Sequence, residues 1–222
     1  MWCVPNITPE FLERMEDVLD LYAKPYDSEE PILCFDEKSK QLLQDTRPIQ
    51  HTREGRVRRR DYEYRRNGTK NIFVTVEPKG GWRGVTVTNR RTRKDFAKEV
   101  KRIIELPRYK RATTIHLVCD NLNTHFEKSF LLTFGQEEQE NIMARLKFHR
   151  TPKHASWLNM AEIEISILER QCLRGRIPDE QTLTAKTSAW NKERNAKRSM
   201  IRWTFTKDDA RNVFQEAMTN LS

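Results

Sequence analysis

Apolar residues at helical spacing mark the first part of the chain. Thr8-Pro9-Glu10 combines a typical N-cap residue, a proline at the first helical position and an acid in the first turn. Apolar side chains then recur every three to four residues from Phe11 to Tyr22, and Pro25 is expected to end the segment. This pattern predicts an N-terminal helix with one apolar face.

Shorter apolar runs, rich in β-branched and aromatic residues, predict strands. The first run opens after Pro31 and stops at Asp36, whereas Asn67-Gly68 predicts a turn ahead of the second run. Pro78, Gly80 and Gly81 separate the second run from the third, which is typical of a hairpin. The strands predicted from these runs cover residues 32–35, 71–78, 82–89, 114–120 and 147–151.

Helical patterns return between and after these strands. Phe96, Val100, Ile103 and Ile104 form an apolar stripe that Pro107 closes. Ser156 is expected to cap a long helix, and Thr206 to Asp209 resembles a capping box. The later helices are predicted near residues 136–146, 156–173, 181–194 and beyond 207. The alternation predicts an α/β fold with helices on both faces of a mixed, partly parallel sheet.

The charge balance points to a polyanionic partner. Lys and Arg number 41 against 32 Asp and Glu, so the formal net charge is +9. Nucleic acid is the usual partner of such a chain, although ribosomal proteins, nucleases and unrelated basic proteins share this property. Within the basic segment 53–66, a strip of arginines could follow a phosphate backbone, or it could be an ordinary solvated loop. The strip consists of Arg53, Arg56, Arg58, Arg59 and Arg60.

Several classes of protein are disfavoured. The four cysteines form no CxxC pair, which disfavours a zinc site or a disulfide framework and is typical of a reducing cytosol. No apolar run is long enough to span a membrane, and the N-terminus lacks the pattern of a secretory signal. We therefore expect no membrane association.

Two aspartates stand directly after apolar strand runs. Asp36 follows residues 32–35, and Asp120 follows residues 115–119. Sites in α/β sheets form beyond the carboxyl ends of strands, so two carboxylates could meet there. Aspartate is also common in the turns that follow strands, and these residues alone do not decide between a site and a turn.

Three longer motifs resemble those of DDE transposases. They are FDEK at 35–38, DNLNTH at 120–125 and TPKHASWLNMAE at 151–162. The sequence is most similar to the bacterial insertion-sequence six-thirty group of the mariner-like superfamily, and DYEYRRNGT, NRRT, RQCLRGRIPD and RWTFTKDDAR extend the likeness. The resemblance runs from about Trp2 to about Phe214. The interval between Asp120 and Glu162 is longer than in many mariner-like members.

The resemblance implies a ribonuclease H-like fold: a mixed five-stranded sheet flanked by helices, with extra N- and C-terminal helices. It maps the catalytic and metal-binding triad onto Asp36, Asp120 and Glu162. Glu164 points about 200° away from Glu162 on a helix, and Glu169 lies about 10 Å further along. The family motif places its acid three residues after Asn159, which selects Glu162.

The resemblance also implies an activity and its partners. The expected reaction is metal-dependent DNA cleavage followed by transfer of the 3′-hydroxyl end, with two Mg²⁺ or Mn²⁺ ions per site. The expected partners are transposon ends and target DNA, bound by a homodimer in the bacterial cytoplasm near the nucleoid. The basic strip could act as a clamp in that dimer.

Supporting roles are expected for five further residues. Lys153 and His154 could contact DNA near the scissile bond. Asn121, His125 and Asn159 could orient the site, or they could simply hydrogen bond to the local backbone.

The domain division follows from the same comparison. Residues 1–30 are expected to be a helical lead-in, the remnant of a linker to a helix-turn-helix region that full-length relatives carry. Residues 31–222 are expected to form the catalytic domain with its C-terminal helices. An inactive DNA-binding remnant and a stand-alone ribonuclease H-like endonuclease are the alternatives.

Overall fold

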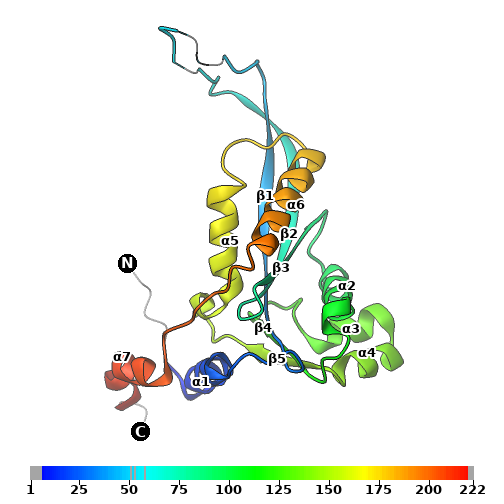
Figure 1. The fold of residues 1–222 in the computed structure, drawn as a ribbon, viewed down its shortest axis with the longest axis vertical. Coiled ribbons are helices and arrows are strands. Elements are labelled where there is room, and N and C mark those ends of the chain that lie inside the picture. The colour runs from blue at the N-terminus through cyan, green and yellow to red at the C-terminus, as the bar shows by residue number, and fades with distance from the viewer. Residues whose placement is uncertain (1–6, 51, 53, 58, 220–222) are drawn as a thin grey trace.

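The computed structural model describes residues 7–50, 52, 54–57 and 59–219, and its centre is one mixed β-sheet (Figure 1). The strand order is β3-β2-β1-β4-β5. β1 is antiparallel to β2 and parallel to β4, while β3 pairs antiparallel with β2 and β5 pairs parallel with β4. The strands are β1 (Ile32–Asp45), β2 (Tyr64–Glu77), β3 (Trp82–Thr88), β4 (Ile115–Cys119) and β5 (Leu146–Arg150).

Helices cover both faces of this sheet, as the alternating pattern predicts. On one face α1, α5 and α6 pack against the even-numbered side chains of β1, such as Cys34 and Leu42. On the other face α2, α3 and α4 pack against the odd-numbered ones, such as Leu33 and Phe35. The helices are α1 (Pro9–Ala23), α2 (Arg93–Ile104), α3 (Glu127–Phe134), α4 (Gln136–Met143), α5 (Met160–Gln171), α6 (Glu180–Ala196) and α7 (Lys207–Thr219), with 3₁₀ turns at Pro107–Tyr109 and Ser156–Leu158.

Polar residues cap the start of α1 and of α7, as the sequence predicts. The Thr8 hydroxyl accepts a hydrogen bond from the Phe11 amide at 3.2 Å, at the start of α1. Thr206 and Asp209 exchange the two hydrogen bonds of a capping box ahead of α7. Each cap satisfies backbone amides that the first helical turn leaves without partners.

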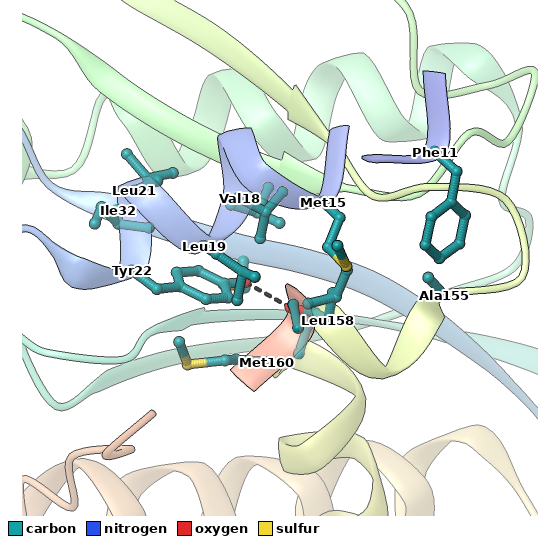
Figure 2. Close-up of a cluster of buried hydrophobic side chains, with 14 of the residues drawn as sticks. Phe11, Met15, Val18, Leu19, Leu21, Tyr22, Ile32, Ala155, Leu158 and Met160 are labelled. Carbon is teal, nitrogen blue, oxygen red and sulfur yellow. Dashed lines mark hydrogen bonds between the residues drawn. The ribbon is translucent and has the colours of Figure 1, made fainter. Parts of the chain in front are cut away.

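The N-terminal helix is part of the hydrophobic core. Phe11, Met15 and Val18 of α1 are buried against Ala155, Leu158 and Met160, which lead into α5 (Figure 2). The Tyr22 hydroxyl donates a hydrogen bond to the carbonyl of Leu158 at 2.8 Å. This contact fixes the segment between β5 and α5 against α1.

The first strand is longer than its apolar run predicts. Asp36 lies inside β1, which continues to Asp45 because it pairs with β2 throughout this stretch. Asn67-Gly68 is a bulge in β2 rather than a turn: the register shifts between Gln41 and Leu43, and Gly68 has φ +85°. The hairpin formed by β1 and β2 projects well beyond the body of the molecule (Figure 1).

Two helix boundaries also differ from the predictions. The segment between β4 and β5 holds two helices, α3 and α4, and Gly135 at φ +88° separates them. Ser156 does not cap α5. It begins a 3₁₀ turn, and Asn159 is the N-cap of α5.

Two further findings concern the described cysteines and helices. Cys34, Cys119 and Cys172 are buried free thiols. None of the described helices combines the length and the apolar character needed to cross a membrane.

Candidate active site

Asp36 within β1 and Asp120 directly after β4 occupy equivalent positions along these neighbouring parallel strands. The register between β1 and β4 pairs Cys34 with Val118. Asp36 and Asp120 each lie two residues further on. Strand alternation places Asp36 on the face that α5 covers, and Asp120 lies close enough for its charge to act on Asp36.

Asn159 fixes the start of α5 against β1. Its side-chain oxygen accepts a hydrogen bond from the Ala161 amide at 3.1 Å, and its amide nitrogen donates to the Phe35 carbonyl at 2.9 Å. Asn159 is buried, so these bonds are shielded from water. Glu162, in the first turn of α5, is thereby held beside the strand that carries Asp36.

The glutamates of α5 have separate surroundings. Glu164 is fully buried and pairs with Arg83 of β3 at 2.8 Å and with Arg194 of α6 at 3.0 Å. Glu169 pairs with Lys38 and Lys40 of β1. The charge of Glu162, by contrast, acts on Asp36.

The electrostatics of Asp36 reflect a crowded carboxylate cluster. Burial raises the pKa of Asp36, the negative charges of Asp120, Glu37 and Glu162 add to this rise, and together they bring it to about 7. The Glu37 amide, which donates to Asp36 Oδ1 at 2.7 Å, opposes this rise. Among the described residues, no cationic side chain contributes to the pKa of Asp36.

Asp120 has a cationic partner in His125. His125 Nδ1 lies 2.7 Å from Asp120 Oδ1, and the Leu122 amide donates to the same oxygen at 3.1 Å. Burial alone would raise the pKa of Asp120, but the hydrogen bond and charge of His125 outweigh it and lower that pKa. Burial would likewise lower the pKa of His125, but Asp120 and Glu37 together raise it to about 9.

The donor atoms of this cluster suit a hard divalent cation. Within the described ranges, no three His, Cys, Asp or Glu side chains are arranged closely enough to hold a metal ion. Carboxylate oxygens are nevertheless the ligands that Mg²⁺ and Mn²⁺ prefer, and a cation would offset the repulsion that raises the pKa of Asp36. The residues therefore fit such an ion in chemistry, although their side chains would have to converge.

The comparison with known protein families agrees with this geometry. Residues 31–184 match the sequence model of a family described as DDE superfamily endonuclease. The chain belongs to the DDE superfamily endonuclease family. The three motifs at 35–38, 120–125 and 151–162 all fall within the matched residues of this DDE endonuclease.

Solved structures of Mos1 transposase share its fold. The Mos1 mariner paired-end complex with Mn has a TM-score of 0.57 at 11% identity, covering 99% of this chain and 65% of that chain. The Mos1 strand transfer complex has a TM-score of 0.57 at 10% identity and covers 99% of this chain and 64% of the other. The paired-end complex with Mg has a TM-score of 0.51 at 12% identity, with 100% and 64% covered.

These likenesses confirm the ribonuclease H-like fold that the motifs imply. The DDE endonuclease chain spans about two-thirds of the length of the Mos1 chains, 65% in the paired-end complex with Mn. No curated protein matches it in sequence.

The supporting residues of the DDE endonuclease have distinct surroundings. Asn121 donates to the Thr151 carbonyl and accepts from Arg14, so it ties the loop after β4 to β5 and α1. Lys153 and His154 are exposed between β5 and α5, and together with Arg14 they line an open pocket beside α1. His154 has a backbone φ of 63°, a conformation that residues other than glycine rarely adopt.

The described arginines of the basic strip, Arg56, Arg59 and Arg60, lie in the connection between β1 and β2, whose hairpin projects beyond the body of the molecule (Figure 1). Arg56 and Arg59 are exposed, and Arg59 exchanges two backbone hydrogen bonds with Gln50 at 3.0 Å. Arg60 instead makes a bidentate contact with Asp45, with both bonds at 2.7 Å. Arg53 and Arg58 lie outside the described residues.

Sequence reasoning missed several charged residues near the proposed triad. Glu37 follows Asp36 directly, and its side chain turns to the opposite face of the sheet, where it meets His125 at 2.9 Å. Arg83 and Arg194 come from distant segments and converge on Glu164. Only the tertiary fold joins these residues, although FDEK does show a second acid beside Asp36.

Proposed function

We propose that this DDE endonuclease is the catalytic domain of a transposase, which cuts DNA and joins the freed 3′-hydroxyl end to a target. One observation carries the proposal. Asp36, Asp120 and Glu162 come from three distant segments, yet the charges of the latter two act on Asp36. Three carboxylates able to converge on divalent ions are the donor set that this chemistry requires.

Asp36, Asp120 and Glu162 would hold two Mg²⁺ or Mn²⁺ ions. When bound, such ions supply activation of the attacking oxygen and charge stabilisation at the leaving oxygen. The protein's own residues supply the positioning: His125 holds Asp120, and Asn159 holds the first turn of α5 beside β1. The Mos1 complexes with Mn and with Mg support this choice of ions.

The proposed substrate is DNA, both as transposon ends and as target. The net charge of +9 favours a polyanion, and the Mos1 relatives include a paired-end complex with a left transposon end and a strand transfer complex. Exposed Arg56 and Arg59 on the hairpin, with Lys153 and His154 near α5, are the proposed phosphate contacts. A homodimer on DNA and membership of the bacterial insertion-sequence group stay predictions.

A strand-transfer assay tests the proposal. The purified chain is mixed with pre-cleaved DNA ends, taken from the sequence that flanks its gene, and a supercoiled target in Mg²⁺ or Mn²⁺. Asp120→Asn and Glu162→Gln are expected to lower joining at least about 100-fold. Glu169→Gln is the matched control, because Glu169 lies on the same helix and pairs with Lys38 and Lys40 instead.

Each outcome has a distinct meaning. Joined products in wild type and Glu169→Gln, but not in the two triad variants, support the transposase. Nicking without joining would favour a stand-alone endonuclease. DNA binding without any product would favour an inactive remnant, and equal product in all variants would refute the role of the triad.

A further inference from the structure

Glu37 is a buried acid that the proposed chemistry does not use. Its side chain is only 2% exposed. As the residue after Asp36 on β1, it lies on the α2 and α3 face of the sheet, whereas Asp36 lies on the α5 face. A buried carboxylate is unfavourable unless it is paired, so its partners indicate what holds it there.

Its nearest partner is the ring of His125. Glu37 Oε2 lies 2.9 Å from His125 Nε2, and Arg91 approaches Glu37 Oε1 from the surface at 3.5 Å. The other ring nitrogen, His125 Nδ1, lies 2.7 Å from Asp120 Oδ1. One imidazole therefore connects the residue after the first catalytic acid to the second catalytic acid.

Aromatic packing leaves this ring little freedom. His125 is 1% exposed, and its ring lies against Phe96 with 4.6 Å between the ring centroids. Phe35 meets it edge-on at 5.6 Å. With the plane of the ring set by packing, the two carboxylates at its ends determine where each nitrogen points.

The contacts to Asp120 are one-sided. His125 and the Leu122 amide both bind Oδ1, and no hydrogen bond reaches Oδ2 from the part of the chain that the structure describes. A carboxylate held by one oxygen presents the other in a fixed direction. Outer partners of this kind typically change metal affinity about 10- to 100-fold when they are removed.

We propose that Glu37 is a positioning residue that acts through His125 to aim the free oxygen of Asp120 at the metal site. The inference rests on the proposed function, in which Asp120 binds metal. Both ring nitrogens lie close to a carboxylate oxygen, with Nδ1 hydrogen-bonded to Asp120 and Nε2 at ion-pair distance from Glu37. A glutamine at position 37 keeps the shape of the side chain but removes the negative charge that faces Nε2.

The test compares Glu37→Gln with Glu77→Gln, a matched control. Glu77 is also 2% exposed and lies on the same sheet, but Arg108 and Tyr109 hold it far from Asp120. Isothermal titration calorimetry measures Mn²⁺ affinity, and nitrogen-15 NMR of the imidazole reports the state of His125. Glu37→Gln should weaken Mn²⁺ binding about tenfold and shift the His125 ring signals, whereas Glu77→Gln should change neither.

A double variant separates positioning from general stability. If Glu37 acts only through His125, then Glu37→Gln combined with His125→Asn should bind Mn²⁺ no more weakly than His125→Asn alone. Additive losses would overturn the inference, and so would unchanged ring signals in Glu37→Gln. If the wild-type chain neither binds Mn²⁺ nor joins DNA, the proposed function fails, and the ring signals alone then decide whether Glu37 controls His125.

Discussion

Replacing Asp36 by asparagine should stabilise the metal-free domain. Burial and the neighbouring acids raise the pKa of Asp36 from 3.8 to about 7, so its charged form is less favourable in the folded than in the unfolded chain. At about 1.4 kcal/mol for each pKa unit, the cost above neutral pH is at most roughly 4 kcal/mol. Solvent relaxation around a partly exposed group reduces this to about 2 kcal/mol. Asparagine removes the charge with little change in shape.

Thermal unfolding in EDTA measures the effect. For a chain of 222 residues, about 2 kcal/mol should raise Tm by roughly 4–8 °C near pH 8. Below about pH 4 both states of the wild-type chain hold the proton, so the gain should vanish there, and it should grow as pH rises toward 7. Mn²⁺ should then stabilise wild type more than Asp36→Asn.

A control with the opposite sign keeps this reasoning testable. Glu164→Gln removes a buried charge that Arg83 and Arg194 neutralise, so it should lower Tm under the same conditions. If Asp36→Asn melts at or below wild type near pH 8, or if its gain is equally large near pH 4, the account of Asp36 as an uncompensated charge is wrong.

Three further predictions follow from the contacts around the site and the hairpin. Glu164→Gln should cost roughly 3 kcal/mol of unfolding free energy by urea titration, because it leaves Arg83 without its full partner. Asn159→Ala should lower the free energy of unfolding by about 1–3 kcal/mol, because it removes the hydrogen bond that holds α5 against β1. Strand transfer should fall by more than this loss of stability explains, and a variant with normal transfer would contradict the prediction. Arg56→Ala should reduce the salt slope of DNA binding by about one, whereas Arg60→Ala should reduce it less because Asp45 already holds Arg60.

The order of the elements, apart from α3, could be predicted because most of them carry a strong local pattern. Capping residues such as Thr8 and Thr206 are where the sequence places them, since a cap depends on neighbours a few residues away. The length of β1 could not be predicted, because its outer half is polar and depends on pairing with β2. Gly68 illustrates the same limit: its positive φ fits a turn or a bulge equally well, and the partner strand decides.

The candidate site could likewise be predicted only in part. Helix geometry separates Glu162 from Glu164 without any structure, because residues two apart cannot share a face. The burial of Glu164 between two arginines, and the link from Glu37 through His125, depend on segments that meet only in three dimensions. Alternation along β1 assigns Glu37 to the opposite face from Asp36, so the contact between Glu37 and Asp120 through His125 could not be predicted from the sequence.

The length of β1 links the hairpin mechanically to the candidate site. From Ile32 to Asp45 it is one continuous strand, with Asp36 in the sheet and the basic hairpin at its far end. A force applied to the hairpin, for example by a bound duplex, would travel along this strand toward the carboxylate. The bulge opposite Leu42 interrupts the regular pairing along that path, so its flexibility would determine how much of a movement of the hairpin reaches Asp36.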